Sequence, residues 1–446
     1  MSEGGWKMDI YRGNIVYSES REKLAVHKNS YIAVENGIVE GIYDVLPEKY
    51  APLPVTDFGD SVIIPAFSDL HVHAPQYPQR GLGMDLLLAD WLNTYTFPQE
   101  AKYADLDYAR AVYDAFLDDL IAHGTMHACV FGTIHRKSVE YLTGQMEKRG
   151  FRAYIGKVNM DMNSPEYLCE TVEESVRETE AFLSDCSGNQ YARPIITPRF
   201  APTCSRELLC GLGKLASKYG VGLQTHLVES KWEAAEAKRL FPDCSCDTEI
   251  YERAGLMGSG PVVAAHFIFP SEDDTRILKK YGGYAVHCPD ATVNVIAGIT
   301  PVSSLARQGV KLALGSDIAG GHLPGTYTQA ARAVQFSKLK WFYEPEGNEA
   351  IPFTHAFYMA TKEGGALFGN VGSLERGYVF DALVIRDFSD PFRGIEPEET
   401  VERFCYTGTA ADIKARFING IGDGSFCVKK STQKEPSPTR EPDLRR

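Results

Sequence analysis

Short apolar runs alternate with helix-like patterns through the middle of the chain. The helix-like patterns occupy residues 107–122, 171–183, 205–219 and 272–280, and a serine, a favoured N-cap residue, begins or directly precedes the last two. The strand-like runs are "IIPAFSDLHVH", "TMHACVFG", "AYIGKVNM", "PIITPRFA", "GLQTHL", "VVAAHF", "GGYAVHC" and "VKLALGSD". Parallel strands are joined by such helices, and eight alternations are typical of a closed barrel. The pattern therefore predicts an α/β protein with a (β/α)8 barrel of the TIM type over residues 65–369.

The two ends of the chain show strand patterns of a different kind. Residues 1–64 contain short strand-like runs separated by turns, and Asn36-Gly37 between alternating apolar positions is typical of a two-residue hairpin. Strand patterns return at "DALVIRDF" and "ARFING". We therefore expect residues 1–64 and 370–428 to pair into a small β-sandwich domain beside the barrel. The polar, proline-containing residues 429–446 are expected to form a disordered tail.

The charge balance of the chain narrows the class of ligand. Its 446 residues are 44% hydrophobic, enough for a large core, and include 46 Lys and Arg against 59 Asp and Glu, a formal charge of -13. Proteins that bind nucleic acid neutralise phosphates with basic patches, and the sequence shows no basic stripe with interleaved aromatic residues. We therefore expect a small-molecule ligand and no nucleic acid.

Targeting and redox features favour a cytoplasmic protein that does not enter a membrane. The first residues lack the charged-then-apolar layout of a secretory signal, and no apolar run of about 18 residues occurs in the sequence. The ten cysteines are scattered, which suits a reducing compartment. The spacing of the one close pair, Cys244 and Cys246, is too tight for the usual zinc clip, so two ordinary thiols are the favoured interpretation.

Polar side chains recur at the ends of the predicted barrel strands. The two histidines of "DLHVH" are two residues apart, so they project to the same side at the end of the first strand. Further histidines end the fifth, sixth and seventh strands, and an aspartate ends the eighth. Active sites of such barrels are built at this rim, and buried polar groups need partners. Six side chains are therefore expected to converge: His71, His73, His226, His266, His287 and Asp317.

Imidazole nitrogens together with one carboxylate are a ligand set that suits zinc. We expect His71, His73, His226 and Asp317 to bind one zinc ion per subunit and to leave a position open for water. His266 either ligates the metal or hydrogen-bonds the bound water. The same ligands admit iron or manganese, so the identity of the metal stays open at this point.

Glu229 follows His226 by three residues, on the loop that leaves the fifth strand. Zinc lowers the pKa of bound water from 15.7 to about 7, but a hydrolysis that expels an amine also needs protons delivered to the substrate. Glu229 is the expected proton shuttle, and Asp317 is expected to assist as a base. A glutamate here would by itself be more typical of a solvated residue at the start of a helix. Because Glu229 lies close to the expected ligand His226, the catalytic role is the favoured interpretation.

Several longer stretches resemble one enzyme family. They are "HVHAPQYPQRGLGMDLLLADWLNTYTFPQEAKY", "GKVNMDMN", "TPRFAPTCS", "THLVES", "AHFIF", "HCPD" and "GSDIAGG", and they cover most of residues 63–322. In these stretches the chain is similar to the guanine deaminases of the amidohydrolase superfamily, and the first stretch is the most diagnostic. The resemblance implies zinc-dependent hydrolysis of guanine to xanthine and ammonia, in purine catabolism, by an enzyme whose relatives are commonly homodimers.

The same resemblance implies a role for each matching position. The implied metal ligands are His71, His73, His226, His266 and Asp317. The implied catalytic residues are Glu229, Asp317 and His266. The implied substrate contacts are Gln76, Arg199, Phe200, His226 and Glu229. Binuclear relatives of this barrel carry a modified lysine on the fourth strand, where this chain has Arg199, so a single ion is expected.

The chemistry of guanine agrees with the three new contacts. Arg199 can donate to the carbonyl oxygen in fixed geometry, Gln76 can both donate and accept, and Phe200 can stack on the ring. Structural roles stay open at this point: Arg199 in an ion pair, and Phe200 in ordinary core packing.

One departure from the family pattern keeps a second substrate class in view. After "HCP" the family has Asn, whereas this chain continues Asp290-Ala291-Thr292-Val293, in a loop expected at the pocket rim. An amidohydrolase acting on another purine, a pterin or a triazine is therefore the alternative. A non-catalytic scaffold is less favoured because the histidines and carboxylates are all present. The other zinc deaminase pattern, H-x-E followed by P-C-x-x-C, does not occur in the sequence.

Overall fold

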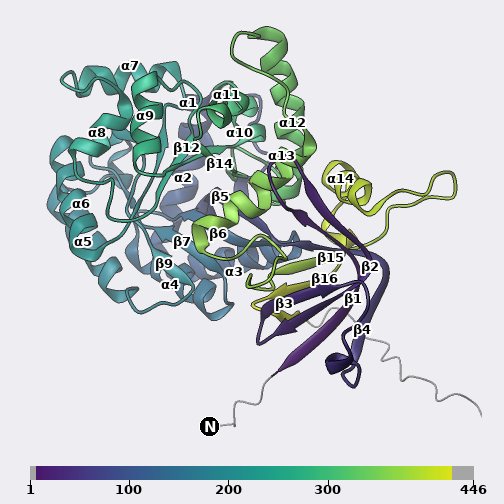
Figure 1. Ribbon diagram of the computed structural model, residues 1–446. Helices are drawn as coiled ribbons and strands as arrows, with labels where there is room; N and C mark the ends of the chain where they lie inside the picture. Colours follow the sequence, from purple (N-terminus) through teal and green to yellow (C-terminus); the bar gives the residue numbers. More distant parts are fainter. Residues whose placement is uncertain (1–6, 424–446) are drawn as a thin grey trace, which may run out of the picture.

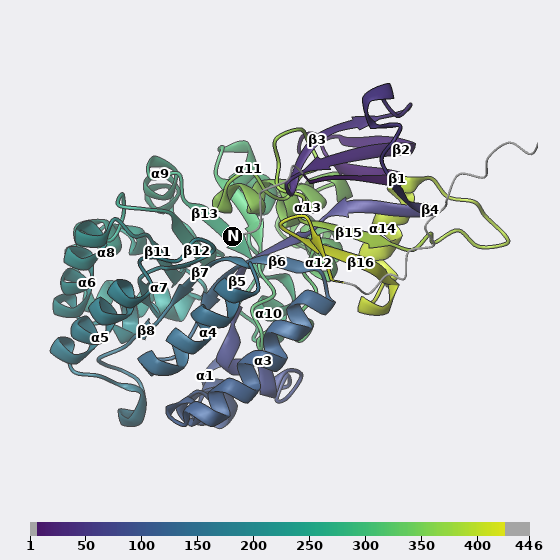
Figure 2. The ribbon, with the colours of Figure 1, turned by 90° about the horizontal axis from the view of Figure 1, so that it is seen from below.

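The computed structural model describes residues 7–423 of the chain, and the tail predicted at residues 429–446 lies outside the described residues. In Figure 1 the teal and green middle of the chain forms a body of helices around short strands. The purple N-terminal strands and the yellow C-terminal strands lie side by side next to that body. Figure 2 shows the same arrangement from below. The first and last strands of the described residues therefore lie together.

Parallel strands joined by helices make up the middle of the chain, so the predicted α/β class is confirmed. One four-stranded sheet contains β5 (Phe67–His73), β6 (Thr125–Phe131), β7 (Arg152–Gly156) and β9 (Ala192–Pro194). A second contains β11 (Leu223–Leu227), β12 (Val262–His266), β13 (Tyr284–His287) and β14 (Lys311–Leu314). The short strands β8 (Val158–Asn159) and β10 (Thr197–Pro198) pair with each other. Each of the eight predicted strand runs overlaps at least one of these strands.

Backbone contacts join the two parallel sheets at both pairs of edges. Ile196, just after β9, forms a parallel bridge with Leu223 at the start of β11. At the other edges the N–H of Asp317, which follows β14, donates to the carbonyl oxygen of His71 on β5 over 2.8 Å. The carboxyl ends of the first and last parallel strands are therefore in direct contact.

Fourteen α-helices lie within residues 7–423. They are α1 (Leu88–Trp91), α2 (Phe97–Ala101), α3 (Leu106–Ala122), α4 (Arg136–Lys148), α5 (Val172–Asp185), α6 (Arg206–Tyr219), α7 (Lys231–Leu240), α8 (Asp247–Arg253), α9 (Glu272–Lys280), α10 (Pro289–Asn294), α11 (Val302–Arg307), α12 (Thr326–Tyr343), α13 (Phe353–Tyr358) and α14 (Pro397–Thr407). The four predicted helices correspond to α3, α5, α6 and α9, so the apolar spacing located them correctly.

Serine side chains cap two of the predicted helices. The hydroxyl of Ser205 accepts a hydrogen bond from the N–H of Leu208 over 3.1 Å at the start of α6. At the start of α9, Ser271 forms a capping box with Asp274, three residues into the motif. Such caps satisfy N–H groups that the helix itself leaves without partners.

Strands from both ends of the chain form one seven-stranded sheet, in the order β17-β16-β15-β4-β1-β2-β3. Its strands are β1 (Met8–Ser18), β2 (Leu24–Glu35), β3 (Ile38–Tyr43), β4 (Val55–Pro65), β15 (Ala382–Ile385), β16 (Ile413–Ile418) and β17 (Ile421–Gly422). The N-terminal and C-terminal segments meet where β4 pairs antiparallel with β15. The rings of Tyr11 and Phe380 stack across this junction with their centroids 5.2 Å apart.

Asn36 and Gly37 form the predicted two-residue hairpin between β2 and β3, where Glu35 pairs with Ile38. Their φ angles are 51° and 82°, both positive, as the favoured hairpin turn requires. A Cβ atom on residue 37 would also collide with the carbonyl oxygen of Asn419, in the turn between β16 and β17. Glycine is therefore required here both for its conformation and for its size.

We expect Gly37→Ala to destabilise the protein by roughly 1–3 kcal/mol, because the substitution adds backbone strain and a collision. The measurement is the shift of the thermal unfolding midpoint. Gly59→Ala is the matched control, since Gly59 has a φ of 59° but nothing lies within 4 Å of its Cβ position. Equal losses of stability in the two variants would contradict a role for the contact with Asn419.

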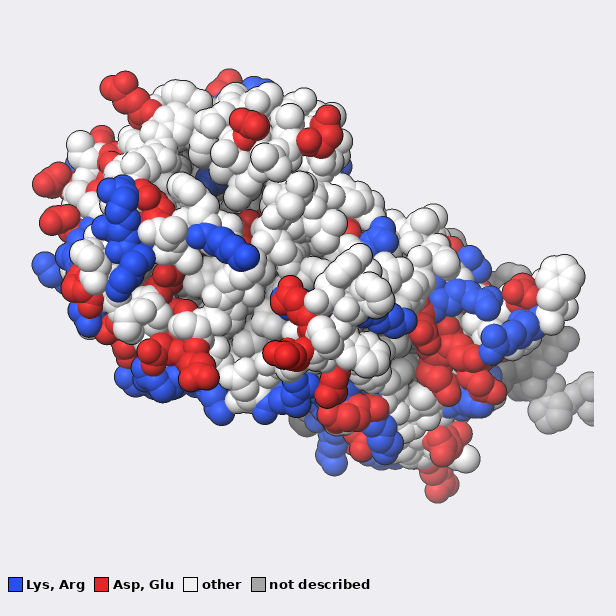
Figure 3. Space-filling model, turned by 90° about the horizontal axis from the view of Figure 1, so that it is seen from above, with Lys and Arg blue, Asp and Glu red and all other residues white. Residues whose placement is uncertain are grey.

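The described residues contain no helix suited to a membrane span, and charges of both signs lie on their surface. No helix among residues 7–423 has both the length and the apolar character of a bilayer span. On the face shown in Figure 3, acidic and basic side chains are interspersed. The cysteines in this part of the chain are free thiols, Cys244 and Cys246 among them.

Candidate active site

The two histidines of β5 face Asp317 where the first and last parallel strands meet. His71 and His73 alternate along β5, so their side chains project to the same side. Nε2 of His71 lies 3.2 Å, and Nε2 of His73 3.5 Å, from Oδ1 of Asp317. Asp317 has a φ of 46°, a left-handed conformation that is uncommon outside turns and functional sites. The fold thus holds these three residues together although they are far apart in the sequence.

His226 and His266 reach the same point from the neighbouring strands β11 and β12. Nε2 of His226 lies 3.1 Å from Nε2 of His73, and Nε2 of His266 lies 3.8 Å from Oδ2 of Asp317. Ligand atoms of His71, His226 and His266 are within 4.8 Å of one another, and the same holds for His71, His73 and Asp317. All five predicted ligand residues therefore share one small volume.

Three of the histidine rings in this cluster are neutral. Burial lowers the pKa of His73 and His226 well below the usual range and that of His266 to about 3, so these rings are neutral. Nδ1 of His226 donates to the carbonyl oxygen of Arg199 over 2.6 Å, which leaves Nε2 as the acceptor.

His71 gives the most direct test of whether a metal fits. Within residues 7–423 neither of its ring nitrogens has a hydrogen-bond partner, although Oδ1 of Asp317 lies close to Nε2. Buried polar atoms without partners are rare and need an explanation. A divalent cation between imidazole and carboxylate would satisfy both groups, so the residues present fit a zinc ion.

Glu229 lies beside the cluster, on the turn between β11 and α7. Its Oε2 is 3.8 Å from Nε2 of His266. Burial raises the pKa of Glu229 well above its ordinary value, and the carboxylates of Glu233 and Asp317 raise it further. The carboxylate of Glu233 accepts hydrogen bonds from the N–H groups of Glu229 (2.7 Å) and Val228 (3.2 Å). A carboxyl group that can hold a proton is thus fixed beside the predicted metal site.

Gln76 and Arg199 reach the same cavity from the segments that follow β5 and β10. Oε1 of Gln76 accepts from the N–H of Ala319 over 3.1 Å, and its Nε2 donates to Glu100 over 2.9 Å. Nη1 of Arg199 donates to the other carboxylate oxygen of Glu100 over 2.8 Å. One buried carboxylate therefore orients both predicted substrate contacts.

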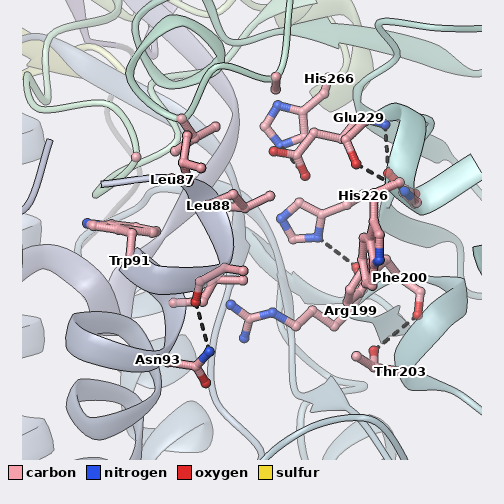
Figure 4. A pocket seen from close by; sticks show the side chains of 18 of the residues that line it. Leu87, Leu88, Trp91, Asn93, Arg199, Phe200, Thr203, His226, Glu229 and His266 are labelled. Carbon is pink, nitrogen blue, oxygen red and sulfur yellow. Dashed lines mark hydrogen bonds and ion pairs between the residues drawn. The ribbon is translucent and has the colours of Figure 1, made fainter. Parts of the chain in front are cut away.

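A cavity of about 760 Å³ opens beside the histidine cluster. In Figure 4, Arg199, His226 and Glu229 lie along one side of it, opposite three apolar side chains: Leu87, Leu88 and Trp91. The ring of Phe200 lies 6.5 Å from that of His226 and 6.2 Å from that of Trp232. Hydrogen-bonding groups on one side and apolar cover on the other suit a flat, polar ring.

The structure places the remaining predicted residues away from the centre of the cluster. The two groups of ligand atoms found among residues 7–423 do not include His287, which ends β13. The carboxylate of Asp290 accepts from Gln329 over 3.0 Å and pairs with Arg332 over 3.1 Å, both on α12. The departure from the family pattern at Asp290 thus ties α10 to α12.

Sequence analysis missed three carboxylates that support the site: Asp69, Glu100 and Glu233. Oδ1 of Asp69 accepts from the N–H groups of His71 (3.2 Å) and Ser316 (3.0 Å), which links β5 to the segment after β14. Glu100 lies in the stretch that carried the family resemblance, and Glu233 lies four residues after Glu229. No sequence pattern indicates that Glu100 contacts Gln76 and Arg199, or that Glu233 contacts the backbone at Glu229.

The α/β fold and the histidine–aspartate cluster define a hydrolase of the amidohydrolase type, and residues 62–421 match the sequence model of the Amidohydrolase family. The chain is 32% identical over 439 residues to the guanine deaminase of Dictyostelium discoideum, covering 92% of this chain and 97% of the relative. It is 34% identical over 436 residues to that of Rattus norvegicus, covering 92% and 95%. A crystal structure of guanine deaminase from C. acetobutylicum, with guanine bound in the active site, superposes with a TM-score of 0.90 at 40% identity, covering 93% of this chain and 100% of that one.

The chain therefore belongs to the guanine deaminase family of the amidohydrolases, hydrolases that act on C–N bonds. The resemblance seen in the sequence and the predicted enzyme class are confirmed. Amidohydrolases are typically metal-dependent, in agreement with the histidine and aspartate ligand atoms that cluster here.

Proposed function

We propose that this protein hydrolyses guanine to xanthine and ammonia. The observation that carries the proposal is the gathering of four imidazoles and Asp317 around one point, with Glu229 beside them. The donors Gln76 and Arg199 face the same cavity. Similarity to guanine deaminases, one of them crystallised with guanine, supports this choice of substrate.

One zinc ion per subunit is the proposed cofactor. His71, His73, His226 and Asp317 would hold it, and His266 would be a further ligand or a partner of the bound water. When bound, zinc acts as a Lewis acid that lowers the pKa of water from 15.7 to about 7.

Glu229 is the proposed proton carrier. Water adds to the carbon that bears the amino group, and Glu229 takes up the released proton and passes it to the adjacent ring nitrogen. The proton that remains on the added oxygen then goes to the amino nitrogen, so the C–N bond breaks, ammonia leaves and the carbonyl group of xanthine forms. One water is consumed for each guanine. Asp317 and His266 both line the cavity; Asp317 would assist as a base, and the neutral His266 would help to hold the water.

Arg199, Gln76 and Phe200 are the proposed substrate contacts, together with the walls formed by His226 and Glu229. Arg199 and Gln76 supply N–H donors for the carbonyl edge of the purine, while Phe200 supplies an aromatic face. The pairing of Arg199 with Glu100 supports a fixed orientation of its guanidinium group.

The finer features of the architecture are also proposals. We propose that the two parallel sheets are halves of one (β/α)8 barrel over residues 65–369, and the contacts at both pairs of sheet edges support its closure. The small β-sandwich domain expected from residues 1–64 and 370–428 stays a prediction, since the strands described within residues 7–64 and 370–423 belong to one seven-stranded sheet. The homodimer and the cytoplasmic location stay predictions, and light scattering of the purified protein tests the first.

The decisive experiment is xanthine formation from guanine by protein of measured metal content. We expect xanthine and ammonia in equal amounts. Other aminopurines, a pterin and an aminotriazine, tested in the same ammonia assay, separate guanine from the alternative substrate class. Faster turnover of one of these compounds than of guanine would overturn the proposed substrate, and no turnover by metal-loaded protein would overturn the enzymatic proposal.

We expect Arg199→Ala to lower kcat/KM for guanine by about 10- to 100-fold, since a hydrogen bond from a charged donor contributes about 1.5–3 kcal/mol. The metal content is expected to stay unchanged. Arg206→Ala is the matched control, because Arg206 pairs with Asp243 in a partly exposed ion pair outside the cavity. Wild-type kinetics of the Arg199 variant would require another donor for the carbonyl oxygen.

A further inference from the structure

Glu100 is a buried carboxylate that connects the two proposed substrate donors. It lies on α2, is 1% exposed, and uses each carboxylate oxygen for a different partner. Oε1 accepts from Nε2 of Gln76 over 2.9 Å, and Oε2 accepts from Nη1 of Arg199 over 2.8 Å. Burying a charge in this way is costly unless it is paired and hydrogen-bonded, and Arg199 supplies the opposite charge.

The contacts at the two ends of the Gln76 amide determine its orientation. The N–H of Ala319 can only donate, so the atom of Gln76 that faces it must be the carbonyl oxygen. The amide nitrogen then faces Glu100, whose Oε1 accepts its hydrogen bond. Both contacts require the same orientation of the amide, so rotating the Gln76 amide by 180° would break two hydrogen bonds.

The same helix also orients Arg199. Phe97 and Glu100 are three residues apart on α2 and share one face of it. The guanidinium carbon of Arg199 lies 5.5 Å from the centre of the Phe97 ring, while Nη1 bonds Glu100. With one N–H group used by Glu100, the remaining N–H groups of Arg199 are available to the cavity that it lines.

We infer that Glu100 is a positioning residue that sets the substrate preference of this site. By holding Gln76 and Arg199 as donors, it selects a purine that presents a carbonyl oxygen over one that lacks this acceptor. The inference rests on the proposed function, since it takes a purine as the occupant of the cavity. Glu100 acts through its two partners and does not touch the reacting atoms.

The test is Glu100→Gln in the full-length, metal-loaded protein. An amide has one acceptor oxygen, so the variant keeps a hydrogen bond from Gln76 or from Arg199 but not from both. KM for guanine is expected to rise by about 10- to 100-fold with kcat changed by less than about threefold, because the lost alignment affects binding. The metal content is expected to match that of the wild type.

A positioning role is separated from simple structural support by comparing the affinities of the site for two unreactive ligands. Hypoxanthine keeps the carbonyl group, whereas unsubstituted purine lacks it. In the wild type, calorimetric titration is expected to show tighter binding of hypoxanthine than of purine. In Glu100→Gln this preference is expected to fall by about tenfold or more, with the affinity for purine little changed.

Glu363→Gln is the matched control, because Glu363 is also a buried carboxylate and pairs with Arg21, between β1 and β2. It is expected to keep the wild-type preference.

If Glu100→Gln does not fold, Glu100→Asp gives the same comparison, since it keeps the charge but is too short to reach both partners. An unchanged preference for hypoxanthine in a folded Glu100 variant overturns the inference. Failure of the wild type to convert guanine would overturn the proposed function instead, and the two titrations would still decide the role of Glu100.

Discussion

Glu229→Gln is expected to lower kcat for guanine by about 10²- to 10⁴-fold, the usual contribution of a general acid–base group. Glutamine has the same shape but cannot take up and release a proton. The raised pKa of Glu229 and its position 3.8 Å from His266 are the reasons for expecting so large an effect. The measurement is steady-state turnover, with metal content and circular dichroism recorded on the same sample.

Glu236→Gln is the matched control for this variant. Glu236 lies on α7, the helix that follows Glu229, and pairs with Arg239 on the outer face of that helix. Its replacement is expected to leave turnover unchanged. Near-wild-type turnover of Glu229→Gln would remove Glu229 from the proposed mechanism and would leave Asp317 as the remaining carboxylate able to move protons.

Removal of the metal is expected to abolish measurable turnover while leaving the protein folded. Without a Lewis acid, water keeps a pKa near 15.7 and is a poor nucleophile at neutral pH. The strands that carry the ligands are held by their own hydrogen bonds and by a large buried core, so we expect the protein to fold without the ion. The measurement is activity and circular dichroism after dialysis against a chelator.

Stepwise return of zinc is expected to restore turnover and to saturate at one ion per chain. Parallel titrations with iron and manganese compare the metals that the same ligand set admits. His226→Ala serves as the matched variant, because it removes one imidazole from the cluster and is expected to weaken metal binding. Full turnover by metal-free protein would contradict the proposed mechanism.

Much of the site's order comes from carboxylates that hold other residues in place. Asp69 accepts from the backbone at His71, Glu233 accepts from the backbone at Glu229, and Glu100 holds Gln76 and Arg199. Each is buried, and each uses hydrogen bonds to fix a residue of the histidine cluster or of the cavity wall. A preorganised site of this kind needs little rearrangement when substrate binds.

The sequence by itself indicated the parallel strands, several of the helices and the residues of the candidate site. The apolar spacing located α3, α5, α6, α9 and the parallel strands, because periodicity reflects which face of each element is buried. The Asn36-Gly37 turn was predictable because few residues adopt two successive positive φ angles. His71, His73, His226, His266 and Asp317 were predictable because polar residues recurred at the ends of otherwise apolar strands.

Only the tertiary structure decided which polar groups lie within reach of one another. Glu100 contacts Arg199 across 99 positions of the chain, and no local pattern encodes that separation. His287 also lies at the end of a parallel strand, like the other histidines, yet it is not in the groups of ligand atoms found among residues 7–423. Strand-end position is a property of local sequence, whereas distance between side chains depends on how the strands and loops are packed together.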